Sequence, residues 1–279
     1  MLKIVITAAG RGTRLLPATK ELPKEMMPIF SSIYGNEKRV IPLLQLIFEQ
    51  MFSIGIRKYC FVVGREKRSI EDHFTPHESF LNEISSDEKK IISKFYKKLM
   101  KSELVWINQN KPLGFGDAVK ITESYIGKDD FIVHAGDVTI IGGKNHPVLR
   151  LMEIAQKVPD ASAILLCKKV SEPKRYGVPE IKERKAGYFT IKNVEEKPNN
   201  PKSIYGILPV YYFTNEIFRS LKNIKPGIKN EYQLTDAIQD LINRDKKVLA
   251  IEINKDEEEI DVGNVFSYKK SLDSSFLKA

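Results

Sequence analysis

Short apolar runs alternate along the chain with longer stretches in which apolar residues recur every three or four positions. The first pattern predicts β-strands and the second predicts amphipathic helices. In the first half we expect strands over Lys3–Ala8, Lys58–Val63, Glu103–Asn108, Phe131–Ala135 and Ala161–Lys168. Strands that alternate with helices indicate a mostly parallel sheet whose faces are covered by helices, as in α/β proteins.

Helical periodicity appears between these strands. The segment Ile41–Phe52 carries an apolar stripe and is followed by Gly55, which is typical of the end of a helix. The segment Asp87–Lys101 carries a second stripe, and its length favours an excursion on the surface over a core element. A third helix is expected from about Gly116 to Tyr125.

The pattern changes after about Lys169. Further elements are expected in this order: strands near 188–191 and 211–213, helices over Glu216–Leu221 and Gln233–Asn243, a strand over Val248–Ile253 and a final helix from about Asn264. No unit of roughly 20 to 50 residues repeats, so we expect no β-helical repeat domain. We interpret residues 1–279 as a single domain, with a first part over about 1–168 and a second over about 169–279.

The composition is that of a globular protein. Of 279 residues, 42% are hydrophobic and 29% are charged, and no apolar run reaches the ~20 residues that a membrane span needs. The chain enters a strand-like run at Ile4 without a basic leader or a small-residue cleavage site, so we expect no signal peptide. Cys60 and Cys167 lie in apolar runs and are expected to be buried thiols, which suits a reducing cytoplasm.

The net charge of +9 is compatible with a nucleic acid, an acidic membrane surface or an anionic small molecule as partner. Lysines are scattered among glutamates, for instance in the segment 87–101, which indicates helix surfaces with many ion pairs. The chain carries no RNA- or DNA-binding signature. We therefore expect a small-molecule partner, with no nucleic acid and no membrane.

The segment 8–28, which reads AAGRGTRLLPATKELPKEMMP, says most about function. Gly10 and Gly12 permit a tight turn whose backbone N–H groups can approach an anion. Three residues bring positive charge to the mouth of the site that this turn would form: Arg14, Lys20 and Lys24. Ligands of open α/β sheets bind beyond the carboxyl ends of the strands, which is where this segment lies. The segment therefore predicts a phosphate site, and the alternative is a glycine turn beside a solvated basic face.

Two features downstream carry further chemistry. Gln109 precedes a loop with Gly114 and Gly116, and its amide offers the donor and the acceptor that match the imide edge of uracil. Asp137 follows the strand Phe131–Ala135, where a carboxylate is well placed to hold Mg²⁺. The alternatives are an ordinary glycine loop before a helix and a simple turn aspartate.

The combination of Gly-x-Gly-Thr-Arg, Leu-Pro-x-Thr-Lys and Pro-Lys-Glu-Met resembles the signature of the sugar-1-phosphate nucleotidyltransferases. The Pro-Lys-Glu-Met wording most resembles the UTP–glucose-1-phosphate uridylyltransferase branch. The resemblance implies a Rossmann-like fold, with a mixed, mostly parallel sheet, flanking helices and a small β-rich sugar-binding part. It also implies Mg²⁺ as cofactor, UTP and glucose 1-phosphate as substrates, and a homo-oligomer, either a dimer or a tetramer. For the oligomer, the exposed surface of the helix over 41–52 is one candidate contact.

The resemblance also assigns roles to individual positions. Nucleotide binding falls to Ala8, Ala9, Gly10, Gly12, Thr13, Gln109 and Gly114, and catalysis to Arg14 and Lys24. Sugar-phosphate binding falls to Tyr176, Gly177, Glu196 and Lys197, and metal binding to Asp137 and Asp261. Taken alone, Glu196 and Lys197 could belong to a surface turn, and Asp261 could instead cap the final helix.

The implied reaction is in-line attack of glucose 1-phosphate on the α-phosphorus of UTP, with release of pyrophosphate. It needs no protein base, because a phosphate monoester with a second pKa near ~6 is already largely deprotonated at neutral pH. Consistently, His134 reads as a strand residue, and His73 and His77 are separated by Pro76, so they do not form a zinc pair.

Two other functions remain open on the sequence. One is a thymidylyltransferase or another sugar-1-phosphate nucleotidyltransferase, and the other is a non-catalytic regulator that binds a nucleotide. The presence of Arg14, Lys24, Asp137 and Asp261 argues against the regulator. Two segments depart from the family pattern and are expected to border the substrates: Ser31–Arg39 and Asn200–Tyr205.

Overall fold

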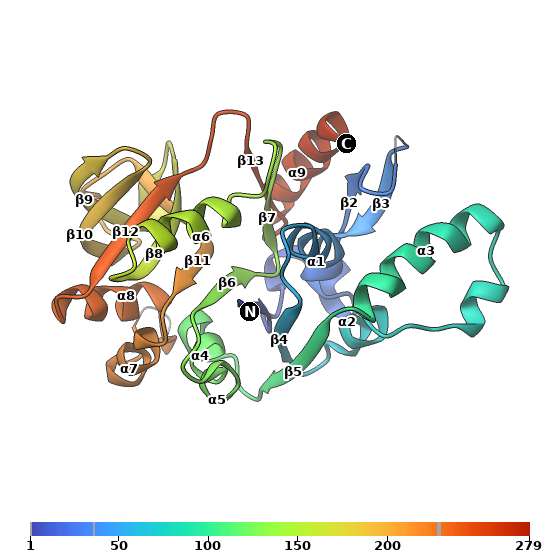
Figure 1. The fold of residues 1–279 in the computed structure, drawn as a ribbon, viewed down its shortest axis with the longest axis horizontal. Helices are drawn as coiled ribbons and strands as arrows, with labels where there is room; N and C mark the ends of the chain where they lie inside the picture. The colour runs from blue at the N-terminus through green and yellow to red at the C-terminus, as the bar shows by residue number, and fades with distance from the viewer. Residues whose placement is uncertain (1, 36, 228–229) are drawn as a thin grey trace.

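The computed structural model describes residues 2–35, 37–227 and 230–279, and its centre is a large twisted sheet (Figure 1). Across this sheet the strands follow the order β5 (Glu103–Gln109), β4 (Lys58–Gly64), β1 (Lys3–Ala8), β6 (Phe131–Ala135), β11 (Tyr205–Phe213), β8 (Ala161–Lys169), β12 (Lys247–Glu252), β10 (Tyr188–Glu196) and β9 (Gly177–Lys185). Strands from the first and the second half of the chain therefore share one sheet.

The sheet is mixed, and its two halves differ. β5, β4, β1 and β6 are parallel to one another. β11 lies antiparallel between β6 and β8, β12 is parallel to β8, and β10 is antiparallel to both β12 and β9. The expected Rossmann-like α/β architecture is confirmed, and the parallel half is the part that presents the carboxyl ends of its strands at one edge.

Helices cover both faces of the sheet, which explains why β6 is buried along its whole length. Ile4 and Ile6 of β1 pack into a cluster with one set of helices: α1 (Leu43–Ser53), α2 (Arg68–His73), α3 (Ser86–Leu99) and α6 (Val148–Lys157). Val5, which points to the opposite face, packs with the other set: α4 (Phe115–Lys120), α5 (Glu123–Ile126), α7 (Glu216–Asn223) and α8 (Leu234–Asn243). Cys60 and Cys167 are buried free thiols in this second layer, as predicted.

Smaller elements complete the edge that carries the site. β2 (Pro28–Ser31) and β3 (Arg39–Pro42) form a hairpin, and β7 (Val138–Ile141) pairs antiparallel with β13 (Glu258–Asp261). The last helix, α9 (Val265–Lys278), packs against both β13 and β2 at the outer edge of the molecule (Figure 1). Short 3-10 turns occur at η1 (Thr13–Leu15), η2 (Ala18–Lys20), η3 (Lys24–Met26), η4 (Ser79–Asn82) and η5 (Pro173–Arg175).

Some predicted boundaries were wrong. The first helix begins at Leu43 because Ile41 is paired with Ile29 in the β2–β3 hairpin. The helix expected over Gly116–Tyr125 is divided into α4 and α5, and at the break the Thr122 hydroxyl donates a hydrogen bond to the carbonyl of Val119. The strands near 188–191 and 211–213 are longer than the apolar runs that revealed them.

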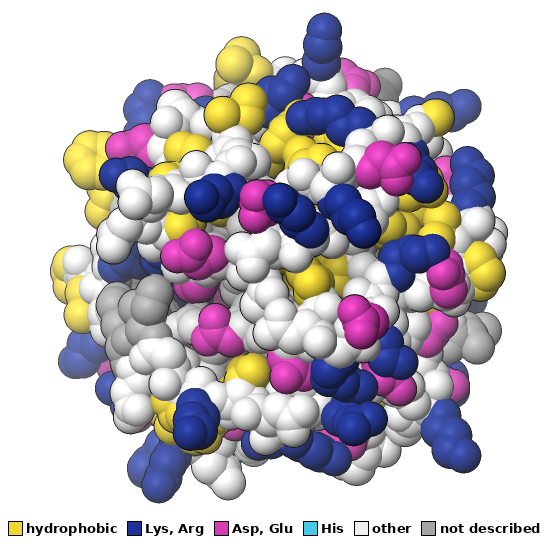
Figure 2. All heavy atoms as spheres, turned by 90° about the vertical axis from the view of Figure 1, so that its left-hand side faces the viewer, with side chains coloured by type: hydrophobic (Ala, Val, Ile, Leu, Met, Phe, Trp, Pro, Cys, Tyr) yellow, Lys and Arg dark blue, Asp and Glu magenta, His cyan; other side chains and the backbone are white. Residues whose placement is uncertain are grey.

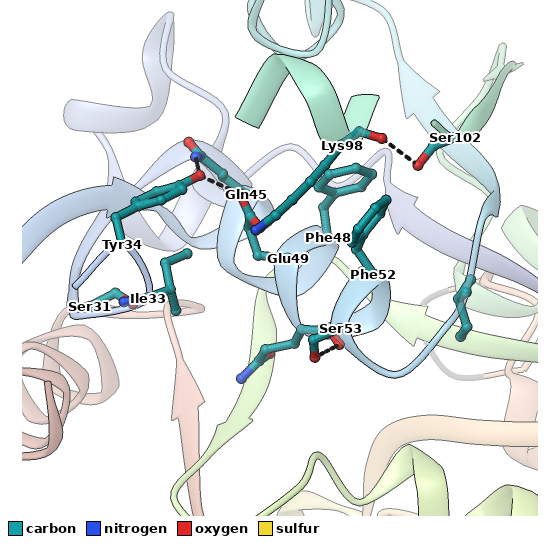
Figure 3. Close-up of polar contacts among 12 residues, drawn as sticks. Ser31, Ile33, Tyr34, Gln45, Phe48, Glu49, Phe52, Ser53, Lys98 and Ser102 are labelled. Atoms are coloured by element: carbon teal, nitrogen blue, oxygen red, sulfur yellow. Dashed lines mark hydrogen bonds and ion pairs between the residues drawn. The ribbon is translucent and has the colours of Figure 1, made fainter. Parts of the chain in front are cut away.

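The α3 prediction is half right. Its first turns are exposed and project from the body of the molecule, whereas Phe95 and Leu99 are buried in the core (Figure 1). A polar cluster also holds α3 and the loop after β2 to α1 (Figure 3). In it, Glu49 accepts a hydrogen bond from the Tyr34 hydroxyl and forms an ion pair with Lys98. The segment Ser31–Arg39 includes Asn36, which lies outside the described residues.

Charges on the surface are interspersed, as the lysine and glutamate pattern indicated. Figure 2 shows basic and acidic side chains side by side over the face that β9, β10 and α8 form. Within the described ranges, no helix is long and apolar enough to cross a bilayer.

The aromatic cluster around Phe48 joins α1, α2, α3 and β4. The Phe48 ring is fully buried, and its centroid lies 4.8 Å from that of Tyr59, 5.6 Å from Phe74 and 5.8 Å from Phe95. We expect Phe48→Ala to lower the free energy of unfolding by about 3–5 kcal/mol, because it leaves a cavity among these rings. Urea unfolding measures the change. Met100→Ala, at a side chain that is 77% exposed, is the control and should change stability by less than ~0.5 kcal/mol. Equal effects of the two substitutions would contradict this account of the core.

Candidate active site

A cleft of about 750 Å³ opens beyond the carboxyl ends of β1, β5 and β6. Many of the residues predicted from the sequence line it together: Ala9, Gly10, Gly12, Thr13, Arg14, Lys24, Gln109, Gly114, Asp137, Tyr176, Lys197 and Asp261. The fold thus gathers residues from distant parts of the chain at one edge of the sheet, where α/β proteins bind their ligands.

Not every expected residue lines the cleft. Ala8 is fully buried at the end of β1, and the side chain of Lys20 is 77% exposed next to Glu21 instead of facing the mouth with Arg14. Likewise, the described residues of the segments 31–39 and 200–205 are not part of the lining. The expectation that Lys20 shares this mouth was therefore wrong.

The glycine turn after β1 is closed by its own neighbours. Gly12 has a φ of 67°, a left-handed conformation that favours glycine. The Thr19 hydroxyl donates a hydrogen bond of 2.8 Å to the Gly12 carbonyl, which fixes the turn. At Gly10, a Cβ atom would lie 3.1 Å from the Lys24 ammonium nitrogen. The small residue at position 10 therefore leaves room for the Lys24 side chain to cross the turn.

Lys24 and Asp137 form an ion pair in the cleft, with side chains that are only 15% and 18% exposed. Burial by itself lowers the pKa of Lys24, but the nearby carboxylates of Asp137 and Glu25 outweigh it and the pKa is raised. Burial raises the pKa of Asp137, but the Lys24 ammonium outweighs it and the pKa is lowered. Both groups are therefore charged at neutral pH, and each holds the other in place.

Asp261 lies beside Asp137 on the same wall. In the β7–β13 ladder Asp261 is opposite Val138, and the Val262 N–H donates a hydrogen bond of 3.1 Å to the Asp137 carbonyl. The reading of Asp261 as a helix cap is wrong: α9 is capped by Asn264, whose side chain accepts hydrogen bonds from the backbone of Phe266 and Ser267.

This pair of carboxylates fits Mg²⁺ better than zinc. Within the described ranges, no group of three or more histidine, cysteine, aspartate or glutamate side chains could hold a metal by itself. Mg²⁺ is usually bound by one or two carboxylates together with water and substrate phosphates, whereas zinc sites need three or four protein ligands. His73 and His77, the pair that was rejected as a zinc site, contact Gln45 and Ser79 respectively.

Gln109, which is expected to contact the nucleobase, is held firmly by its own neighbours. Its amide nitrogen donates hydrogen bonds to Asp117 at 2.8 Å and to the Gly114 carbonyl at 3.2 Å. Gly114 has a φ of 108°, and a Cβ atom there would lie 2.8 Å from the carbonyl oxygen of Tyr232. The glycine loop is therefore explained in part by its close contact with the 231–232 segment, a reason that the sequence did not reveal.

The four residues expected to bind the sugar phosphate form a second group. Gly177 and Glu196 are opposite each other in the β9–β10 ladder, and the Lys197 N–H donates a hydrogen bond of 3.0 Å to the Tyr176 carbonyl. Tyr176 and Lys197 line the cleft, but Glu196 borders a neighbouring pocket of about 470 Å³ and accepts a hydrogen bond of 2.7 Å from the Thr235 hydroxyl.

Several residues that carry charge in or near the cleft were missed, among them Glu25, Lys67, Glu259 and Lys168. Glu25 and Lys67 form a buried ion pair of 3.0 Å, with side chains that are 1% and 8% exposed. Glu259 also lines the cleft and pairs with Lys168. Glu25 lies within the Pro-Lys-Glu-Met motif, so the sequence could have indicated that it belongs to the site. No local sequence feature indicates this for Lys67 or Lys168.

His134 does not line the cleft. It is fully buried in β6, and burial lowers its pKa to about 4, so its ring is neutral at pH 7. This confirms its reading as a strand histidine.

Comparison with known proteins agrees with this geometry. Residues 3–274 match the nucleotidyl transferase family. The chain is 35% identical over 275 residues to the UTP–glucose-1-phosphate uridylyltransferase of Streptococcus pneumoniae serotype 4, a match that covers 96% of this chain and 88% of that protein. It is also similar to the solved structure of apo UDP-glucose pyrophosphorylase, with a TM-score of 0.88 and 30% identity over 100% of this chain and 99% of that chain. A second similar structure is UDP-glucose pyrophosphorylase complexed with UDP-glucose, with a TM-score of 0.86 and 30% identity over 100% of both chains.

The buried pair of Lys67 and Glu25 leads to a stability prediction. We expect Lys67→Met to lower the free energy of unfolding by about 3–5 kcal/mol, because it leaves the Glu25 carboxylate buried without its partner. The double variant Glu25→Gln/Lys67→Met should recover most of that loss, since no unpaired charge remains. Urea unfolding of both variants measures the difference. A single variant as stable as the parent would show that the pair does not hold η3.

Proposed function

Because this chain belongs to the nucleotidyl transferase family, we propose that it transfers a uridylyl group from UTP to glucose 1-phosphate, giving UDP-glucose and pyrophosphate. The relative that was compared above is named for this reaction, and one similar solved structure is complexed with UDP-glucose. The observation that carries the proposal is the cleft in which the glycine turn, Lys24 and the carboxylates of Asp137 and Asp261 meet.

The triphosphate would be held by the turn after β1. The backbone N–H groups of Ala9, Gly10, Gly12 and Thr13 supply neutral donors, and Arg14 and Lys24 supply positive charge at the same place. Ala8 ends β1 and sets the position of the turn. Charge on the phosphates increases as the bond to pyrophosphate breaks, and fixed cations stabilise that change without rearranging.

The base and the sugar would lie at opposite ends of the cleft. Gln109, whose amide nitrogen donates to Asp117 and Gly114, would present its amide oxygen to the edge of uracil, and Gly114 would allow the base to approach the backbone. At the other end Lys197 would bind the phosphate of the sugar beside Tyr176. Gly177 and Glu196, which are paired across β9 and β10 next to Lys197 but do not line the cleft itself, would contact the hydroxyl groups of the sugar.

The reaction itself is a displacement at phosphorus. An oxygen of the sugar phosphate attacks the α-phosphorus of UTP, a new P–O bond forms, and the bond to the departing pyrophosphate breaks. Since the nucleophile is largely deprotonated at neutral pH, the protein has to align two anions and offset their repulsion. Asp137 and Asp261 are the residues that would hold Mg²⁺, which when bound supplies charge neutralisation at the phosphates.

The test of this function is a matrix of substrates. Pyrophosphate release is measured with UTP, dTTP, CTP, ATP or GTP, each combined with several sugar 1-phosphates, with Mg²⁺ and with Mg²⁺ removed by chelation. We expect the highest kcat/KM for UTP with glucose 1-phosphate, and no turnover without the metal. Release that is fastest with dTTP, or no release from any pair, would refute the uridylyl assignment.

Removal of the Lys24 charge should affect turnover strongly. We expect Lys24→Met to lower kcat by on the order of a hundredfold or more, because a fixed cation at the phosphates is lost. Lys20→Met is a matched control from the same loop, since Lys20 is exposed and does not line the cleft. Steady-state kinetics are compared with thermal unfolding of both variants. Near-parental kcat in a folded Lys24→Met protein would remove Lys24 from the mechanism.

A further inference from the structure

A further carboxylate, that of Glu259, stands on the same wall of the cleft as Asp261. Both residues belong to β13, which pairs with β7 (Figure 1). They are two positions apart, so their side chains point to the same face of the strand, roughly 7 Å from one another along it. Glu259 lines the cleft, and its side chain is 13% exposed. One face of β13 therefore presents two carboxylates to the site.

One oxygen of the Glu259 carboxylate is already held. Its Oε2 forms an ion pair with the ammonium group of Lys168, a residue that is 22% exposed and lies near the end of β8. The other oxygen, Oε1, accepts no hydrogen bond from any residue that the structure describes, and it is not buried. Lys168 thus fixes the carboxylate and leaves one acceptor free toward the cleft.

Lys168 also connects this free acceptor to the sugar end of the cleft. Its ammonium lies 5.7 Å from the centroid of the Tyr176 ring, within the range of a cation–π contact. The Tyr176 carbonyl in turn accepts the hydrogen bond from the N–H of Lys197. Tyr176 therefore contacts two lysines, and each of them is paired with a glutamate: Lys197 with Glu196, and Lys168 with Glu259.

The chemistry of a free carboxylate oxygen restricts what it can bind. An ionised carboxylate only accepts hydrogen bonds, so its ligand has to be a donor. The phosphates of both substrates are anionic at neutral pH, and a carboxylate repels them. The remaining donors near the transferred group are the hydroxyl groups of the hexose and of the ribose. The link from Glu259 through Lys168 to Tyr176 favours the hexose, because Tyr176 lies beside Lys197 at the sugar end.

We infer that Glu259 accepts a hydrogen bond from a hydroxyl group of the hexose, and that Lys168 is the positioning residue that holds its carboxylate for this contact. The inference rests on the proposed function, because it takes a sugar 1-phosphate and a UDP-sugar as ligands of the cleft. Glu259 then selects sugars that carry a hydroxyl at the matching ring position. A sugar without that hydroxyl leaves the carboxylate without its donor, which weakens binding.

Calorimetric binding to the full chain with Mg²⁺ present tests the contact. The ligands are UDP-glucose, analogues that each lack one hydroxyl of the glucose, and an analogue that lacks one hydroxyl of the ribose. For one of the glucose analogues we expect a Kd at least ~tenfold above that of UDP-glucose in the parent, because a bond to a charged acceptor is lost. In Glu259→Gln the same analogue should cost less than ~threefold, since the acceptor is neutral. The cost of the ribose analogue should be equal in both proteins.

Glu258→Gln is the matched control. Glu258 is the adjacent residue of β13, and it faces α9, where it accepts a hydrogen bond of 2.7 Å from the Ser274 hydroxyl. This variant should bind every ligand as the parent does. Equal costs for each glucose analogue in the parent and in Glu259→Gln would overturn the inference. A cost that disappears in Glu259→Gln only for the ribose analogue would overturn it too.

Two further outcomes separate this inference from its premises. A parent that binds no UDP-sugar refutes the proposed function and the contact together, whereas unchanged costs in a parent that binds UDP-glucose refute only the role of Glu259. Titration with Mg²⁺ provides the second comparison. If Glu259→Gln needs more Mg²⁺ for binding but keeps the parent's costs for every glucose analogue, Glu259 is a metal ligand and the sugar contact is excluded.

Variants of Lys168 test its positioning role. We expect Lys168→Met to raise the Kd of UDP-glucose at least ~fivefold and to leave the Kd of UDP unchanged, because only the hexose meets the carboxylate. Lys168→Arg should recover most of the loss. Should Lys168→Met fail to fold, Lys168→Met/Glu259→Met removes the contact without leaving an unpaired charge, and it should show the same difference between the two ligands. Equal weakening of UDP and UDP-glucose would show that the pair only supports the fold, which would overturn the proposal.

Discussion

An anionic substrate needs cations that stay charged and keep their positions in a largely buried cleft. Two neighbouring ion pairs beside the glycine turn hold such cations in place. Lys24 pairs with Asp137, and next to it Glu25 pairs with Lys67. Each charge is stabilised by an opposite one, because an unpaired charge at this depth would be strongly unfavourable. The result is a site whose donors and acceptors stand in position before any ligand arrives.

The mixed sheet explains how the pairs come together. The parallel strands β1, β4 and β6 end at one edge, so the segments that follow them carry Lys24, Lys67 and Asp137 to neighbouring positions. β13 then returns from the end of the chain to pair with β7, which brings Asp261 to the same wall. Side chains at such strand ends are held by the backbone ladder as well as by their own contacts.

The last helix connects this wall to the outside of the molecule. Ser271 holds the backbone of Asp261 from the inner face of α9, while Phe266 and Leu277 of the same helix remain exposed.

The sequence by itself determined the strands, the helices and the chemistry at the ends of strands, because periodicity and turn-forming residues act over a few positions. Gly12, Lys24 and Asp137 could be found in this way, and Asp261 through the resemblance of its motif. Only the tertiary structure decided which distant segments meet: Lys67 with Glu25, and the 231–232 segment with Gly114. It also removed Lys20 from the mouth of the cleft and buried the face of α1. The physical reason is that such pairings depend on sheet order and long-range packing, which no local pattern encodes.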